Sequence, residues 1–227
     1  MPATCCGTSR ECSGSGRPPC ATDRPAAPDE DASRPERPAS YDGLLRAFDE
    51  ASATLVDALA GAKPDERAWT WSADQTVGFI GRRQAHEALI HRVDAEQTAG
   101  WVTPLDPALA AEGVLKVLDV MYGGAPEWGE FHGLRHYVRL DCTDADASVW
   151  VQIGRFVGTD PGSGEHHDDD DLRVVGDPGV EADAVVEGPA AALDTWLWRR
   201  GDSDEINVHG DRSIYDHFRS AVHHPIT

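Results

Sequence analysis

A change of hydrophobic period near residue 126 limits the folds that this chain can adopt. Between residues 41 and 121, apolar residues recur at three- and four-residue steps, which is typical of amphipathic helices. Beyond Pro126, apolar and polar residues alternate, which is typical of half-buried strands. Because helices come first and strands follow, the sequence predicts an α+β protein rather than repeated β-α units.

Capping residues and glycines give the limits of the expected elements. Helices are predicted at 41–61, from Ser72 or Asp74 as N-cap to about Ala99, and at 106–121. In the second half, two strands are predicted at 134–142 and 148–157, joined through Asp144–Asp146. Two shorter strands are predicted at 181–187 and 206–209, and two helices at 190–200 and 211–222. The acidic run His166–Asp171 is expected to be a solvated loop.

Three segments follow from these patterns. Residues 1–40 contain four cysteines and many prolines without any period, so we expect this segment to be disordered. Its cysteines lack the paired C-x2-C spacing of a zinc knuckle. Residues 41–124 are predicted to form a helical domain, and residues 125–227 a small α+β domain. Cys142, in a predicted strand, is expected to be a core residue.

The net charge of the chain excludes some classes of binding partner. The 227 residues include 40 acidic and 20 Lys+Arg residues, for a net charge of −20. Such a surface does not attract nucleic-acid phosphates or anionic membranes. The charge also fits the composition of a high-GC genome. Because no run of about 18 apolar residues and no N-terminal apolar stretch is present, we expect a soluble cytoplasmic protein.

The segment 82–96 carries most of the chemistry. On a helix, its polar residues form one narrow stripe: Arg83, Gln84, Glu87, His91 and Asp94. Glu87 and His91 lie four residues apart and share a face. Imidazole and carboxylate are zinc ligands, so the pair is a candidate metal site. A simple surface ion pair explains the same spacing. His86 lies about 100° round the helix and is a supporting or core histidine.

Several segments resemble the mycothiol-dependent maleylpyruvate isomerase family. The similar segments span roughly residues 41–222, and the specific part lies around Ala85–Glu96: Trp69–Trp71, Gln75–Val77, Arg82–Glu96, Pro104–Ala110, Gly188–Ala190, Leu197–Arg199 and Gly210–Asp211. The resemblance implies a DinB-like four-helix bundle followed by a small α+β domain. It also implies a divalent metal, usually zinc, held by His, Glu and His, of which the last two align with Glu87 and His91.

The first histidine of that ligand set lies on an earlier helix in the family. This sequence has no histidine before His86, so we expect an incomplete, N-terminally truncated bundle. A truncated or wrongly chosen start, a frame error upstream and real loss of the ligand all explain this departure.

The resemblance implies that mycothiol supplies a nucleophile. A metal stabilises its thiolate, which adds to the double bond of a cis-dicarboxylate and leaves a single bond that can rotate. Elimination of the thiolate then gives the trans isomer, here maleylpyruvate to fumarylpyruvate. Arg199 and Arg200 are candidate catalytic clamps for substrate carboxylates, although a helix C-terminus also attracts arginine. Arg83, His86 and Asp94 are expected to support the bound cofactors.

Two hypotheses of different classes follow. The first is a metal- and mycothiol-dependent isomerase or thiol transferase acting on a small unsaturated acid. The second is a non-catalytic family member that binds a small ligand or regulates, including one whose α+β domain takes an apolar ligand. Neither predicts an oligomeric state.

Overall fold

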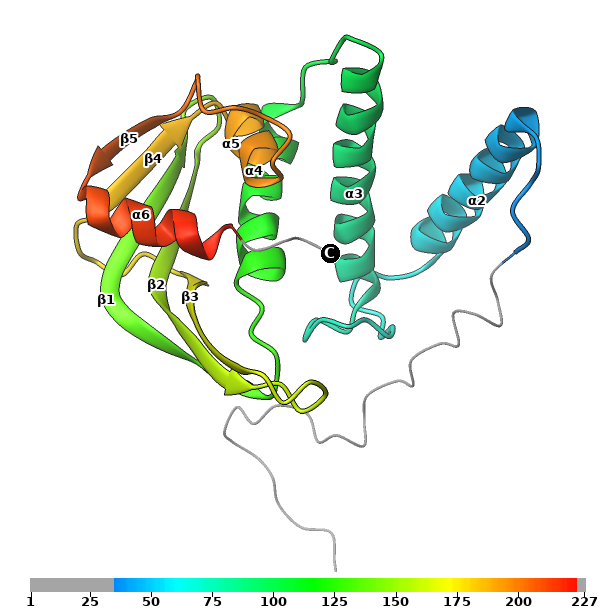
Figure 1. Ribbon diagram of the computed structural model, residues 1–227. Helices are drawn as coiled ribbons and strands as arrows, with labels where there is room; N and C mark the ends of the chain where they lie inside the picture. Colours follow the sequence, from blue (N-terminus) through cyan, green and yellow to red (C-terminus); the bar gives the residue numbers. More distant parts are fainter. Residues whose placement is uncertain (1–34, 224–227) are drawn as a thin grey trace, which may run out of the picture. The chain divides into compact units, whose positions relative to one another are not determined.

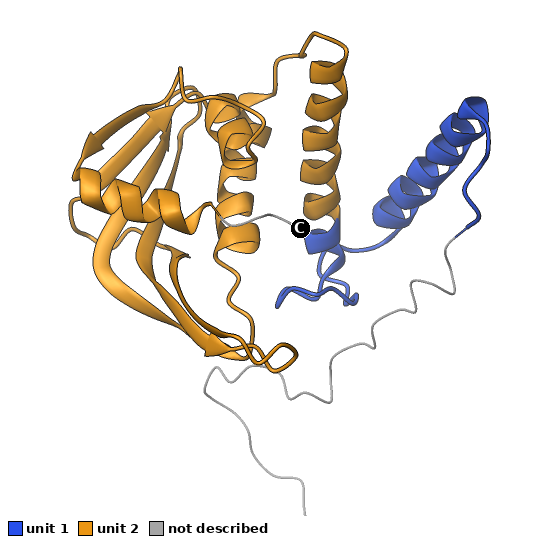
Figure 2. Ribbon diagram, in the orientation of Figure 1, with its two compact units in different colours: residues 1–80 blue, residues 81–227 orange. Residues whose placement is uncertain are grey.

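A computed structural model describes residues 35–223, and Figure 1 gives the order of their helices and strands. The chain divides into two compact units after Ile80, coloured separately in Figure 2. Most of the cysteine-rich segment expected to be disordered lies outside the described residues. The domain limits at residues 40 and 124 stay predictions. The helices and strands together make an α+β protein, as expected.

The first unit contains helix α2, Tyr41–Gly61. The Ser40 hydroxyl accepts a hydrogen bond from the Gly43 N–H at 3.1 Å, so this helix begins where the sequence predicted. A loop follows in which the Thr70 hydroxyl donates to the Asp74 carbonyl at 2.8 Å and the Gln75 side chain donates to the Thr70 carbonyl. These bonds hold the chain in a compact turn ahead of the next helix.

Helix α3 covers Val77–Thr98 and begins later than predicted. Thr76, rather than Ser72 or Asp74, caps it, because its hydroxyl oxygen accepts a hydrogen bond from the Phe79 N–H at 3.1 Å. The Asp74 carboxylate instead accepts a hydrogen bond from the Thr76 hydroxyl, with an oxygen–oxygen distance of 2.6 Å. The end is as expected, since Gly100 adopts a φ of +84° just after the last turn.

Helix α4, Pro107–Lys116, continues directly into a π-helical segment, η1, Val117–Tyr122. The Asp106 carboxylate accepts a hydrogen bond from the Leu109 N–H at 2.9 Å, which confirms the predicted start. Gly123 ends the segment, as predicted. Among the described residues no helix is both long and apolar enough to cross a membrane.

A five-stranded sheet with the order β3-β2-β1-β4-β5 forms the other layer of the second unit. The strands are β1 Gly129–Cys142, β2 Ala147–Thr159, β3 His166–Val175, β4 Ala184–Gly188 and β5 Asn207–Gly210. β1 and β2 form the predicted antiparallel hairpin, while β1 and β4 run parallel. Buried and less buried residues alternate along β1, β2 and β4, so one face of the sheet carries the core.

The expectation that His166–Asp171 is a solvated loop was wrong. These residues open β3, which pairs antiparallel with β2 along its whole length. Arg155 on β2 reaches across and pairs with Asp168 at 2.7 Å and Asp170 at 2.8 Å. Cross-strand ion pairs compensate the run of like charges, and Leu172 anchors the strand in the core.

Helices α5, Ala190–Leu197, and α6, Arg212–Ala221, complete the unit. Their buried side chains join a single core with α3, α4 and the sheet. Trp196, Trp198 and Cys142 belong to this core, which confirms the sequence prediction for Cys142. Figure 1 shows α4 and α5 side by side.

A buried carboxylate lies between α4 and α5. Asp194 is fully buried, and neither of its carboxylate oxygens has a hydrogen-bond partner among the described residues. Burial raises its pKa to about 7, although the Trp198 side chain opposes this shift. Gly113 on α4 makes room for it, because a Cβ there would lie 2.6 Å from Asp194 Oδ2.

Replacing Gly113 by alanine is expected to destabilise the protein. Alanine normally stabilises a helix by up to about 1 kcal/mol relative to glycine. Here the added methyl group meets the Asp194 carboxylate, so we predict a net loss of about 1–3 kcal/mol in the free energy of unfolding. Urea unfolding measures it. Gly61→Ala at the end of α2, where a Cβ meets no atom within 4 Å, is the control. Equal stability of G113A and wild type would contradict the packing described.

Asp194→Asn is expected to remove a pH dependence of stability. The pKa of Asp194 rises from 3.8 to about 7 on folding, so the folded state holds the proton more tightly. Stability therefore falls as the pH rises from about 4 to 7, by about 4 kcal/mol in total. We predict that D194N gains stability relative to wild type across this window in pH-dependent urea unfolding. Asp204→Asn, an exposed control, should follow wild type, and parallel curves for D194N and wild type would refute the prediction.

Candidate functional site

A continuous series of ion pairs runs along one side of α3. The Arg83 guanidinium pairs with Glu87 Oε1, and Glu87 Oε2 lies 3.4 Å from His91 Nε2. His91 Nδ1 lies 3.4 Å from Asp94 Oδ2. Arg200 Nε and Nη2 then donate to the two carboxylate oxygens of Asp94, at 3.0 and 3.3 Å. We call these five residues the α3 ion-pair chain.

The periodicity of α3 produces this arrangement. Leu89, Ile90 and Val93 enter the core and fix the rotation of the helix. Residues 83, 87, 91 and 94 consequently share the opposite side, as the sequence predicted. Arg200 comes from the segment after α5 and brings the C-terminal part of the chain to this helix. Its hydrogen bond holds the pKa of Asp94 below the ordinary value.

The separation of Glu87 and His91 fits two ligands of one divalent metal ion. In a tetrahedral site with metal–ligand bonds of about 2.0–2.1 Å, neighbouring donor atoms lie about 3.4 Å apart. The measured Oε2–Nε2 distance is 3.4 Å. The other ring nitrogen of His91, Nδ1, lies beside the Asp94 carboxylate, the kind of contact that orients a metal-binding imidazole. However, within residues 35–223 no cluster of three His, Cys, Asp or Glu side chains suits a metal ion.

His86 faces a different direction from the ion-pair chain, toward α4. Its side chain is buried, and Nε2 is 3.9 Å from Oε1 of Glu112 on α4. Burial lowers its pKa, with help from the charges of Lys116 and Arg83, while Glu112 opposes the shift. His86 is therefore a neutral residue of the α3–α4 contact at neutral pH.

Arg199 and Arg200, the candidate clamps for substrate carboxylates, line different pockets. Arg200 pairs with Asp94 and also donates to the Trp198 carbonyl at 2.6 Å. It lines a pocket of about 360 Å³ between the C-terminal part of α3, the loop 102–105 and α5. Arg199 has a φ of +62° and lines a neighbouring pocket with Arg219, which shares Gly201 and Asp202 with the first. The backbone turn between the two residues separates their side chains.

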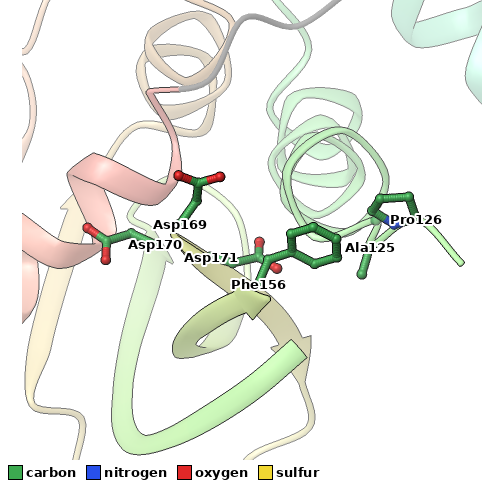
Figure 3. A pocket seen from close by; sticks show the side chains of 7 residues that line it. Ala125, Pro126, Phe156, Asp169, Asp170 and Asp171 are labelled. Atoms are coloured by element: carbon green, nitrogen blue, oxygen red, sulfur yellow. The ribbon is translucent and has the colours of Figure 1, made fainter. Parts of the chain in front are cut away.

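A third pocket, of about 180 Å³, lies at the acidic end of β3 (Figure 3). It is lined by Asp169, Asp170 and Asp171 together with Phe156 from β2. Asp170 pairs with Arg155 and accepts a hydrogen bond from His217 Nε2 at 2.7 Å. These pairs serve the packing of α6 on β3, so we do not assign a reaction to this pocket.

Cys142 is buried in β1, and burial raises the pKa of its thiol to about 11. A thiol with such a pKa is protonated at neutral pH and is a poor nucleophile. Any thiol chemistry at the α3 site therefore needs a sulfur that Cys142 does not supply.

Sequence reasoning missed two features of these sites. The Arg200–Asp94 pair joins residues that are 106 positions apart in the sequence, so no local sequence pattern predicts it. Arg219 looked like an ordinary charged residue near the end of a helix. Its guanidinium lies 4.5 Å from the centre of the Trp196 ring, a contact that only the packing of α6 against α5 creates.

Comparison with known proteins places the chain in a family. Residues 9–96 match the family described as the mycothiol maleylpyruvate isomerase N-terminal domain, and residues 108–217 match the MDMPI C-terminal domain. No curated protein matches. Among solved structures, a protein named UbiJ-SCP2 ubiquinone synthesis protein is 18% identical, with a TM-score of 0.28, over 53% of this chain and 93% of its own. The two family matches together span most of the sequence, and the chain belongs to the mycothiol-dependent maleylpyruvate isomerase family.

Proposed function

We propose that this protein is a metal- and mycothiol-dependent isomerase or thiol transferase that acts on a small unsaturated acid. One observation carries the proposal: Glu87 Oε2 and His91 Nε2 lie 3.4 Å apart on the same side of α3. This spacing suits two ligands of one divalent cation, and zinc is the cation we propose. Membership of the family supports the involvement of mycothiol.

The other residues of the α3 ion-pair chain position these two donors. Arg83 pairs with Glu87 Oε1 and leaves Oε2 available to bind the metal ion. Asp94 contacts His91 at Nδ1, and in this proposal it orients the ring so that Nε2 faces the metal ion. Arg200 in turn holds Asp94 through both carboxylate oxygens. We assign Arg83, Asp94 and Arg200 as positioning residues.

The cofactors would supply the chemistry that the described side chains lack. A divalent cation beside the sulfur of mycothiol favours the thiolate, whose addition and elimination allow a cis double bond to become trans. The raised pKa of Cys142 supports an external thiol. The cytoplasm is the compartment we propose, since thiols stay reduced there.

The pocket lined by Arg200 is the proposed place for the acid substrate. Arg200 lines it and pairs with Asp94, which contacts His91, so the pocket adjoins the α3 ion-pair chain. Its volume of about 360 Å³ is that of a small-molecule site. Gln97 donates to the Arg200 carbonyl at 2.7 Å and holds the backbone beside this pocket.

A second candidate function is non-catalytic binding of a small ligand. It is favoured by one observation: the part of the chain that the structure describes offers no third protein ligand beside Glu87 and His91. His91 is also 69% exposed, which is more than most closed metal sites allow. The metal content of the protein separates the two functions.

Wild-type protein purified with zinc in the medium is expected to hold about one zinc per chain. Because each ligand contributes directly, Glu87→Ala and His91→Ala should weaken zinc binding by about 100-fold or more. Elemental analysis and competition with a chelating dye measure this. Turnover of maleylpyruvate with added mycothiol should fall in parallel.

A matched control exists elsewhere in the second unit. Glu187 and His209 form an exposed Glu–His pair, with Oε1 and Nε2 3.1 Å apart, on the neighbouring strands β4 and β5. His209→Ala should leave zinc binding unchanged. Zinc-free wild-type protein, or equal zinc binding by wild type and H91A, would favour the non-catalytic function.

Asp94→Asn tests the positioning part of the proposal. The amide keeps the shape of the side chain but removes the charge that orients His91 and pairs with Arg200. We predict zinc binding about 10–100-fold weaker than wild type with the fold retained. Circular dichroism checks the fold and the dye competition measures affinity. Unchanged affinity would mean that Asp94 does not act on His91.

A further inference from the structure

The pocket that receives Arg199 is separate from the α3 ion-pair chain. It has a volume of about 320 Å³ and lies between the end of α5, the loop 201–203 and the end of α6. Its cationic side chains come from two elements: Arg199 follows α5, and Arg219 lies in the last turn of α6. Trp196, Leu197 and Val222 supply apolar lining.

Arg219 differs from most arginines of this acidic protein. Arg139, Arg155 and Arg212, for example, each pair with an aspartate at 2.7–2.9 Å. In contrast, Arg219 has no carboxylate within 4.0 Å among residues 35–223, and its guanidinium lies against the Trp196 ring. Stacking on an aromatic face leaves the N–H groups at the edge of the guanidinium directed outward.

Arg199 is held in an unusual backbone conformation. Among the described residues other than glycine, it alone has a positive φ, at +62°. Such a conformation costs a side-chain-bearing residue about 1 kcal/mol or more, and such residues cluster at binding sites. Arg199 lines the same pocket as Arg219.

The charges of both arginines reach a common neighbour. Tyr122 donates from its hydroxyl to the Leu197 carbonyl at 2.8 Å. Burial raises the pKa of Tyr122, while the charge of Arg199, its hydrogen bond with the Tyr122 side chain and the charges of Arg219 and Arg200 oppose that shift. Tyr122 is therefore close enough to both arginines of the pocket to be affected by their charges.

An aspartate and a histidine also line the pocket. Asp202 lines it, and its Oδ1 accepts a hydrogen bond from the Asp204 N–H at 3.1 Å. His223 lies at its exposed edge. The ligand that fits has an anionic group for the two guanidinium groups and an apolar body for the lining.

We propose that Arg199 and Arg219 form a binding site for a small organic carboxylate, with Trp196, Leu197 and Val222 contacting its apolar part. This site goes beyond the function proposed for α3, because it needs neither a metal nor a thiol. A carboxylate and an inorganic anion such as phosphate can both bind a planar guanidinium fork in a bidentate manner. Only an organic carboxylate also brings an apolar part to the lining of Trp196, Leu197 and Val222.

The test is a calorimetric titration of the full chain with benzoate in the presence of a metal chelator. We expect saturable binding with a Kd on the order of 1 mM or tighter. Benzyl alcohol, the neutral analogue, should not bind, and inorganic phosphate should bind more weakly than benzoate. Equal binding of phosphate and benzoate would contradict the proposed apolar contact. Absence of saturable benzoate binding would overturn the proposal.

Variants locate the binding. Arg219→Gln should weaken benzoate binding about tenfold or more, and Arg219→Lys, which keeps the charge, should weaken it less. Arg199→Gly removes the second guanidinium at a positive φ that glycine adopts freely, so its fold should persist. Unaltered affinity in both R219Q and R199G would overturn the site.

Arg212→Gln is the matched control. Arg212 lies on the same helix and over an aromatic ring, 5.0 Å from the centre of Tyr215, but outside the pocket. R212Q should bind benzoate like wild type, and an equal loss in R212Q and R219Q would contradict a local site. Zinc content is measured separately. Loss of zinc binding at α3 and loss of benzoate binding at this pocket are therefore measured independently.

Discussion

The ion pair between Asp94 and Arg200 is the interaction on which the arrangement of the α3 site depends. It joins a central helix to the segment after α5 through two nitrogen–oxygen contacts. Once Asp94 is held, His91 has a carboxylate on its Nδ1 side and Glu87 on its Nε2 side. The core contacts of Leu89, Ile90 and Val93 fix the helix rotation that makes this possible. Core packing of α3 and the ion pair with Arg200 therefore determine the positions of Glu87 and His91 together.

Local physics accounts for most of what the sequence predicted. Ser40 and Asp106 cap their helices, Gly100 ends α3 and the stripe around Glu87 shares one side, because each depends on residues within one helical turn. The strand at His166–Val175 was missed because its stability comes from Arg155 across the sheet rather than from its own alternation. Both arginine pockets required the tertiary structure for the same reason.

The two arginines after α5 separate two kinds of chemistry. Arg200 is committed to Asp94, so any action on a substrate passes through a side chain that already positions the α3 donors. Arg199, with its positive φ, joins Arg219 against the opposite part of α5. The two neighbouring arginines, which the sequence suggested as clamps for substrate carboxylates, therefore line two different pockets. The buried Asp194 between α4 and α5 adds a dependence of stability on pH to the same region.

The state of the His91 ring tests the central claim most directly. Nitrogen-15 NMR of the imidazole, assigned by comparison with H91A, reports which ring nitrogen carries the proton. We predict that Nδ1, toward Asp94, carries the ring proton and that the Nε2 signal changes strongly when zinc is added. A ring protonated on Nε2 with a signal that zinc does not alter would contradict the account.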